Sequence, residues 1–170
     1  MNDARLEAGE PGQSLAIIWH SRTGGARAMA QAISAGAGEG GRLLAADGAT
    51  AADLLAAQAY VFVCPENLGS MSGVMKDLFD RTYYPLLGHI EGRAYATAIA
   101  AGSGGQGAQA QIDRIVTGWR LRRVAEPVIV DFAAQTPEAI LADKSLPDMA
   151  HGICHDLGSA MVEGLRLGIF

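Results

Sequence analysis

Charged residues, proline and cysteine are all scarce in this sequence. Only 18% of its 170 residues are Asp, Glu, Lys or Arg, against about 25% in an average globular protein. The low proline count, 6 against 22 glycines, excludes a collagen-like chain, and the 49% of hydrophobic residues excludes a disordered one. A chain with so few charges is expected to bury much of its surface, within itself or against a second copy.

Two further absences limit the cellular setting. Cys64 and Cys154 form no CxxC or zinc-type spacing, which excludes a disulfide framework and favours a reducing compartment. No stretch approaches about 18 uninterrupted apolar residues, so no membrane span is predicted. Residues 1–13 form a polar leader without the apolar core of a signal peptide. We therefore expect a cytoplasmic protein with one domain over residues 14–170.

The net charge of −5 lacks the basic field that binding to phosphate backbones requires. No nucleic-acid partner is therefore expected.

Strands and helices alternate along the chain. Short apolar runs without internal alternation are typical of parallel strands covered on both faces. The predicted strands are residues 14–19, 42–46, 59–64 and 93–101, with a fifth inside residues 123–132 whose core is 127–132. The predicted helices are residues 27–34, 50–58, 74–83, 108–119 and 149–167. This order predicts an α/β fold, a doubly wound five-stranded parallel sheet with strand order 2-1-3-4-5 and helices on both faces.

Local signals refine three of these helices. The four glycines of residues 35–41 are expected to end the first helix. Thr50 and Asp53 have the spacing of a near capping box at the start of the second. In the last helix, a four-residue repeat predicts one buried apolar stripe, formed by Ile153, Leu157, Met161 and Leu165.

Three polar, glycine-rich loops follow the first, third and fourth predicted strands. In open α/β sheets, ligands bind beyond the carboxyl ends of neighbouring strands, where these loops would converge. Loop one (residues 21–26) combines hydroxyls and free backbone N–H groups at a helix start, an arrangement that suits a phosphate. It lacks the lysine of a Walker A loop. The alternative is an ordinary turn whose hydroxyl caps the helix.

Loop two (residues 65–73) is rich in amide, hydroxyl and glycine groups. Its polar groups would contact the edge of a planar heterocycle, and Leu68 and Met71 would pack against the ring. The alternative is a long loop closed by its own hydrogen bonds.

Loop three (residues 102–107) matches GxGxxG between a strand and a helix. This leaves a dinucleotide-binding alternative open, with Asp131 as the ribose ligand. That fingerprint, however, normally follows the first strand of a Rossmann unit, whereas here it follows the fourth.

Together the three loops resemble the flavodoxin-like FMN proteins, in particular the branch of NAD(P)H-dependent FMN reductases and NAD(P)H:quinone oxidoreductases. HSRTGGARAMA is similar to the family's phosphate loop, although Ala26 stands in place of the final hydroxyl residue. PENLGSMSGVMKDLFDRT is similar to its Pro-Glu-Tyr-Asn-Gly-Ser segment, but Asn67 and Leu68 replace Tyr-Asn, so a stacking aromatic is absent. GSGGQGAQAQI is similar to its third loop.

The resemblance implies a flavodoxin-like fold that binds FMN on the three loops. The cofactor-binding residues it implies are Ser21, Arg22, Thr23, Gly24, Gly25, Ala26, Pro65, Glu66, Asn67, Leu68, Gly69, Ser70, Met71, Gly102, Ser103, Gly104, Gly105 and Gln106. It implies ping-pong hydride transfer from NADH or NADPH to a small-molecule acceptor (a quinone, azo or nitro compound, or a free flavin). No side chain is assigned a catalytic role, and a homodimer or homotetramer is expected. The alternatives are a non-enzymatic electron carrier and a flavin-free binding module.

The remaining histidines, Cys64 and one basic patch are assigned no functional role. His151 and His155 share a helix face, but no third ligand supports a metal, and none is expected. Cys64 is interpreted as a buried small residue, and His20 as structural. The basic patch at residues 119–123 could contact an NADPH phosphate, although a solvated helix end is the default interpretation.

Overall fold

The computed structural model describes residues 14–170, so the leader predicted for residues 1–13 lies outside the described part. Three parallel strands form the centre of the sheet: β1 (Leu15–Trp19), β3 (Ala59–Asn67) and β5 (Ala94–Ala101). On one side β1 pairs with β2 (Gly41–Ala45), which gives the order β2-β1-β3-β5. The predicted order of these strands is confirmed, and with it the predicted α/β fold class.

The fifth position of the sheet is occupied by two short strands instead of one. β6 (Arg122–Arg123) and β7 (Val128–Asp131) both pair with β5, so the single strand predicted over residues 127–132 is only part of the edge. Between the pairs Tyr95↔Arg123 and Ala98↔Val128, β5 has two residues and its partner has four. The extra residues bulge out and interrupt the ladder.

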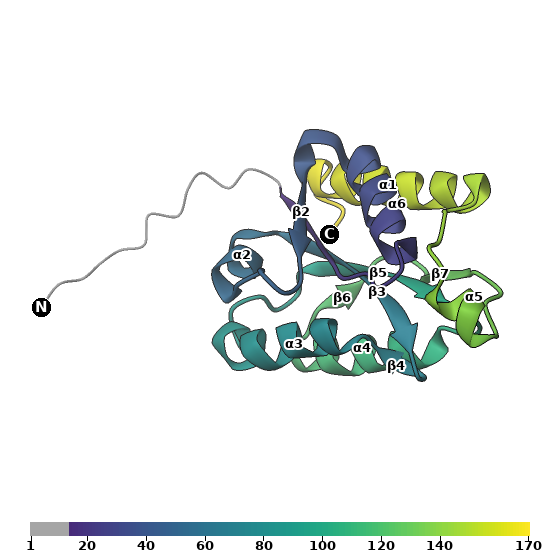
Figure 1. The fold of residues 1–170 in the computed structure, drawn as a ribbon. Coiled ribbons are helices and arrows are strands. Elements are labelled where there is room, and N and C mark those ends of the chain that lie inside the picture. The colour runs from purple at the N-terminus through teal and green to yellow at the C-terminus, as the bar shows by residue number, and fades with distance from the viewer. Residues whose placement is uncertain (1–13) are drawn as a thin grey trace, which may run out of the picture.

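Helices cover both faces of the sheet, as Figure 1 shows. One face carries α1 (Gly25–Ala37) and α6 (Asp148–Arg166), which pack against each other. The other carries α2 (Ala51–Ala56), α3 (Gly73–Leu86) and α4 (Gln106–Gly118). A short 3-10 turn, η1 (Gly38–Gly40), leads from α1 to β2. No helix within residues 14–170 is long and apolar enough to cross a membrane.

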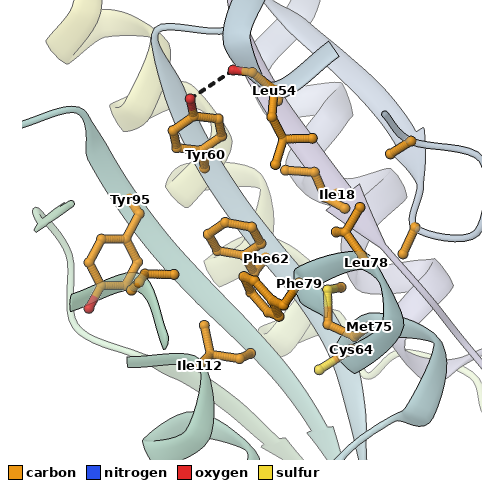
Figure 2. Close-up of a cluster of buried hydrophobic side chains, with 14 of the residues drawn as sticks. Ile18, Leu54, Tyr60, Phe62, Cys64, Met75, Leu78, Phe79, Tyr95 and Ile112 are labelled. Carbon is orange, nitrogen blue, oxygen red and sulfur yellow. Dashed lines mark hydrogen bonds between the residues drawn. The ribbon is translucent and has the colours of Figure 1, made fainter. Parts of the chain in front are cut away.

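The central strands contribute alternate side chains to two hydrophobic cores. On β3, Tyr60, Phe62 and Cys64 face α2, α3 and α4, while Val61 and Val63 face α1 and α6. Figure 2 shows the first core, where Phe62 meets Phe79 at 5.1 Å between ring centroids. The Tyr60 hydroxyl, buried there, donates to the carbonyl of Leu54 at 2.7 Å. Strands buried on both faces account for the apolar runs in the sequence.

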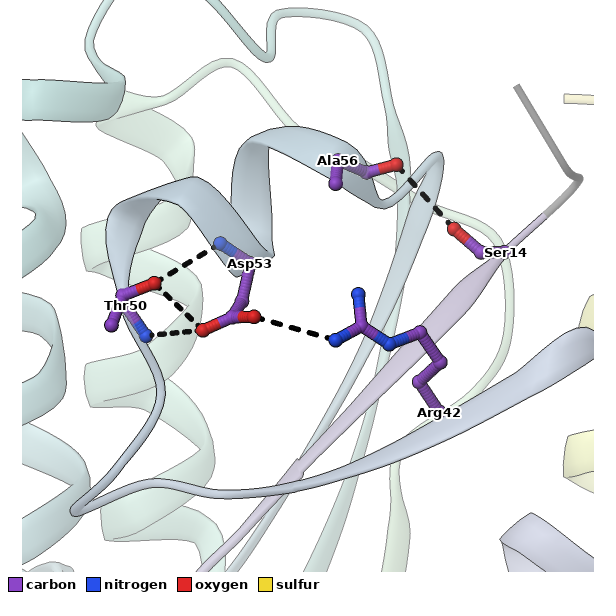
Figure 3. Close-up of polar contacts among 5 residues, drawn as sticks. All are labelled: Ser14, Arg42, Thr50, Asp53 and Ala56. Carbon is purple, nitrogen blue, oxygen red and sulfur yellow. Dashed lines mark hydrogen bonds and ion pairs between the residues drawn. The ribbon is translucent and has the colours of Figure 1, made fainter. Parts of the chain in front are cut away.

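The start of α2 confirms the cap predicted there. The Thr50 side chain accepts from the backbone N–H of Asp53, and the Asp53 carboxylate accepts from that of Thr50, which completes a capping box (Figure 3). The Thr50 hydroxyl also donates to this carboxylate at 2.7 Å, and the hydrogen bonds from that hydroxyl and from the Thr50 N–H are the main reason that the pKa of Asp53 is lowered. Arg42 on β2 also pairs with this carboxylate at 3.3 Å, so the cap joins the helix to the edge strand.

The glycines of residues 35–41 end the first helix as predicted, with Gly38 as its C-cap, although α1 continues past Ser34 to Ala37. One prediction about the last helix is wrong. In α6, Ile153 is half exposed, and the buried stripe runs instead through Cys154, Leu157, Met161 and Leu165. The shift to Cys154 follows from the 3.6-residue period of the helix, which a strict four-residue repeat overshoots.

Candidate cofactor site

The three glycine-rich loops meet at one edge of the sheet because β1, β3 and β5 are neighbours. They surround a hollow with about 490 Å³ of empty space, open solvent included. Its lining consists of Ser21, Arg22, Thr23, Gly25, Ala26, Pro65, Glu66, Asn67, Ala100, Ala101, Gly102, Phe132, Ala134, Ile140 and Lys144.

Loop one presents the open N-terminus of α1 to this hollow. The N-cap residue is Gly24, in the left-handed conformation at φ 93°, and no side chain caps the helix. Its own N–H donates to Ser21 Oγ at 3.1 Å. The N–H groups of the first helical turn have no intrahelical acceptor, so they are available to an anion. Arg22 adds a positive charge, whereas Ala26 contributes only a buried methyl group.

Loop two is a β-hairpin, so it is closed by its own hydrogen bonds, as the alternative interpretation of this loop has it. β3 continues to Asn67 and pairs antiparallel with β4 (Ser70–Met71), so the turn consists of Leu68 and Gly69, both with positive φ. α4 holds the hairpin through Gln111, whose amide accepts from the Met71 N–H and donates to Ser70 Oγ, both at 2.9 Å. Leu68 is fully exposed at the tip, and Met71 is buried in the core.

Glu66 connects this hairpin to loop three. Its carboxylate accepts from the N–H of Gly105 at 3.0 Å and from that of Ala108 at 2.9 Å. These N–H groups belong to the start of α4, so a carboxylate of the chain already caps this helix. The dinucleotide-binding alternative needs a pyrophosphate at the same place. The hydrogen bonds of Glu66 therefore argue against that alternative.

The glycines of loop three allow close packing more than they contact the hollow. A Cβ on Gly107 would overlap the carbonyl of Gly69, and one on Gly105 would overlap Ile129. Ser103 and Gln106 are exposed.

The structure brings nine of the eighteen predicted cofactor-binding residues to the hollow. They are Ser21, Arg22, Thr23, Gly25, Ala26, Pro65, Glu66, Asn67 and Gly102. The other nine shape the loops without lining it: Gly24, Leu68, Gly69, Ser70, Met71, Ser103, Gly104, Gly105 and Gln106. The hollow thus involves nearly all of loop one but only the start of loops two and three.

One wall of the hollow has no counterpart in the prediction. Phe132, Ala134, Ile140 and Lys144 come from the connection between β7 and α6, which contains a short helix, α5 (Pro137–Leu141). Two signals were available: Thr136 followed by Pro137 at the first helical position marks a helix start, and the segment follows the fifth strand at the same edge of the sheet as the loops.

Two side chains near the loops are structural in their contacts. His20 Nδ1 lies 2.9 Å from Ser72 Oγ, which joins the end of β1 to the start of α3. Burial lowers the pKa of His20, and nearby Asp47 opposes this shift more weakly. Burial also raises the pKa of the Cys64 thiol to about 12, so it stays protonated at neutral pH.

The basic patch at residues 119–123 lies at the opposite end of β5 from the hollow. Arg122 and Arg123 pair with Ala94 and Tyr95, where β5 begins, and Arg123 forms an ion pair with Asp113. The idea that this patch contacts a phosphate in the site is therefore wrong. His151 and His155 are exposed on α6, and residues 14–170 contain no cluster of three metal-binding side chains.

Comparison with known proteins identifies the family. Residues 45–135, more than half of the chain, match the model of the NADPH-dependent FMN reductase family. The chain belongs to this family. It is a flavodoxin-like FMN protein, as the sequence motifs implied.

Relatives and solved structures agree with this membership. This chain is 32% identical over 160 residues to a flavodoxin from Aquifex aeolicus (strain VF5), and the match covers 89% of this chain and 86% of the relative. Its fold is similar to that of a flavodoxin from the domain Archaea, with a TM-score of 0.72 at 16% identity, over 90% of this chain and 99% of the other. A WrbA-like flavodoxin from Agrobacterium tumefaciens gives 0.69 at 16% identity, over 91% and 98%.

The residues of the hollow fit FMN. The open N-terminus of α1, with the hydroxyls of Ser21 and Thr23 beside it, forms a donor set for a phosphate monoester. Pro65, Ala100, Phe132 and Ile140 provide apolar surface for a planar ring. The glycine at position 25 lets the Phe132 ring pack directly on loop one, because a Cβ there would lie 2.9 Å from that ring.

Proposed function

We propose that this protein is an NAD(P)H-dependent FMN oxidoreductase that passes electrons to a small-molecule acceptor (a quinone, azo or nitro compound, or a flavin). One observation carries the assignment of the phosphate position. Of the two helices that follow loops one and three, α4 is capped by Glu66, whereas no side chain within residues 14–170 caps α1. An anionic ligand is therefore favoured at α1.

In this proposal the chain's own residues bind and orient the cofactor. Ser21, Thr23 and the first N–H groups of α1 hold the phosphate, and Arg22 partly neutralises it. Asn67 and the backbone around it contact the polar edge of the ring. When bound, FMN accepts a hydride and passes electrons onward. The carboxylate of Glu66 is held by two N–H groups, so we assign it no proton-transfer role.

A second candidate is a non-enzymatic electron carrier of the flavodoxin type. The 32% identity to a protein named flavodoxin favours it. Against it, the hollow's described lining contains a single aromatic residue, Phe132, which packs against loop one rather than standing on loop two or three.

Two measurements on the purified protein distinguish the oxidoreductase from the electron carrier. Apoprotein should bind added FMN at micromolar concentrations or below, as measured by quenching of flavin fluorescence. Anaerobic addition of NADPH or NADH should then bleach the flavin without a second reductase, and benzoquinone should restore its colour. Bleaching only through an added reductase would identify the carrier. Failure to bind FMN would contradict both candidates and favour the flavin-free binding module.

We also infer a homodimer or homotetramer in the cytoplasm, with residues 14–170 as one FMN-binding domain. Met149 and Ile153, which are exposed one turn apart on α6, support self-association. Light scattering of the purified protein measures the assembly, and a monomer at micromolar concentration would contradict it.

A further inference from the structure

The connection between β7 and α6, residues 132–147, joins two of the loops around the hollow. At its start, Phe132 donates to the carbonyl of Ala101 and Ala134 to that of Gly102, both at 2.8 Å. At its other end, the N–H of Lys144 donates to the carbonyl of Thr23 in loop one, also at 2.8 Å. The connection is therefore fixed to loop three and to loop one, and its middle forms a wall between them.

The contact with loop one is close. An added Cβ on Gly25 would lie 2.9 Å from Cζ of Phe132 and 3.4 Å from Cβ of Lys144. A Cβ on Gly24 would lie 3.4 Å from the carbonyl oxygen of Lys144. The wall thus packs directly on the loop that presents the open N-terminus of α1.

Lys144 holds the wall together through its side chain. Its ammonium donates to the carbonyl oxygens of Ala139 at 2.6 Å and Ile140 at 3.2 Å, and also to that of Ala142. These carbonyls end α5, which has only five residues. So short a helix is not stable alone and depends on its end contacts. At its other end, Thr136 Oγ1 accepts from the N–H of Ala139.

We propose that Lys144 is a positioning residue that locks residues 132–147 against loop one and thereby slows the dissociation of FMN. The proposal rests on the proposed function, in which the FMN phosphate binds on loop one. The ammonium is engaged by three carbonyls, so it acts through the wall and not as a phosphate ligand. Ile140 lines the hollow from α5 itself, so its position depends on the helix that Lys144 holds.

The sequence provides a matched control, because Lys76 and Lys144 are its only lysines. Lys76 is exposed on α3 and pairs with Asp80 at 2.6 Å. Lys144→Met keeps the aliphatic stem and removes the ammonium. We expect it to raise the FMN dissociation rate about tenfold, since it removes charge-assisted hydrogen bonds, with little change in the association rate. Lys76→Met should leave both rates unchanged, and Lys144→Arg should restore most of the slow dissociation.

The rates are measured by stopped-flow recovery of flavin fluorescence, with riboflavin as a second ligand. A clamp affects FMN and riboflavin alike, whereas a direct phosphate contact affects FMN alone. If Lys144→Met speeds the dissociation of FMN but not of riboflavin, or if its FMN dissociation rate is within about twofold of wild type, the proposed role of Lys144 is overturned while FMN binding stands. Wild-type protein that binds no FMN overturns the proposed function instead.

A second variant covers the case in which Lys144→Met does not fold. Thr136→Ala removes the cap of α5 from its other end and should speed FMN dissociation in the same direction, by a smaller factor. Faster hydrogen exchange within residues 137–144 should accompany it, with an unchanged circular dichroism spectrum. Unchanged dissociation in a folded Thr136→Ala variant would contradict the clamp.

Discussion

At the scale of single residues, Leu68 is poorly suited to its position, both in its exposure and in its backbone conformation. It is a fully exposed leucine at the tip of the β3–β4 hairpin, with φ 53°. Two-residue turns of this kind favour Asn followed by Gly, because both central residues need positive φ. Here Gly69 meets that need and Leu68 does not. The sequence alone identified Leu68 as a departure from the family, and the structure shows its backbone consequence.

Leu68→Asn should therefore stabilise the apoprotein. The leucine makes no buried contact that would be lost, and Asn adopts positive φ with less strain, so we expect a gain of about 0.5–1 kcal/mol. Urea denaturation measures it. Leu87→Asn is the matched control, because Leu87 is also exposed but has φ −60°. Equal shifts in the two variants would contradict the role of backbone strain.

At the scale of elements, the contact between α1 and α6 depends on glycine. An added Cβ on Gly36 would overlap the carbonyl of His155, and one on Gly158 would overlap the carbonyl of Ile33. The two helices therefore approach backbone to backbone on one face of the sheet. Gly36 therefore serves this contact, whereas the next glycine, Gly38, is the C-cap that ends α1. Glycine excess in this chain has a packing role as well as a role in loops.

Gly158→Ala and Gly152→Ala should have opposite effects, although both lie within α6. Gly158→Ala forces the helices apart and should cost about 2–3 kcal/mol of unfolding free energy. Gly152 has open space around its Cβ position, so Gly152→Ala should stabilise the helix by about 0.5–1 kcal/mol. Thermal and urea unfolding of both variants provide the measurement. Stabilisation by both would mean that the close approach is not required.

The elements that the sequence analysis missed are the short ones. β4 has two residues and α5 has five, so neither contains a full period of a hydrophobic pattern. β4 exists because Gln111 and β3 bind its backbone, and α5 because Thr136 and Lys144 cap its ends. Such contacts join residues distant in sequence, or depend on side-chain direction, and leave no periodic signal.

At the scale of the whole molecule, the loops are joined into one unit by hydrogen bonds between them, some from side chains and some from the backbone. Glu66 links the hairpin to the start of α4, and residues 132–147 link loop three to loop one. The site is thus supported by contacts between segments, on a rigid parallel sheet. Each loop motif could be found separately in the sequence, but not the connections between them.

Glu66→Gln should weaken this unit. The amide keeps one acceptor and loses the charge that favours the helix N-terminus, so we expect a loss of about 1–2 kcal/mol of unfolding free energy at neutral pH. The amides of Gly105 and Ala108 should exchange hydrogen faster. Glu126→Gln, at an exposed glutamate between β6 and β7, is the control. Unchanged exchange at Gly105 and Ala108 would contradict the capping role.

The sequence by itself determined the alternation of strands and helices, the order of the central strands and the positions of the three loops. Those features depend on local sequence patterns and on the right-handed crossover that nearly all parallel βαβ units share. Only the tertiary structure decided which helix N-terminus, that of α1 or that of α4, has its N–H groups free to bind a ligand. The carboxylate of Glu66 reaches α4 across 39 residues of sequence to Gly105 and leaves α1 uncapped. Low charge content had indicated extensive burial; folding decided which of the few charges were used to hold the site together.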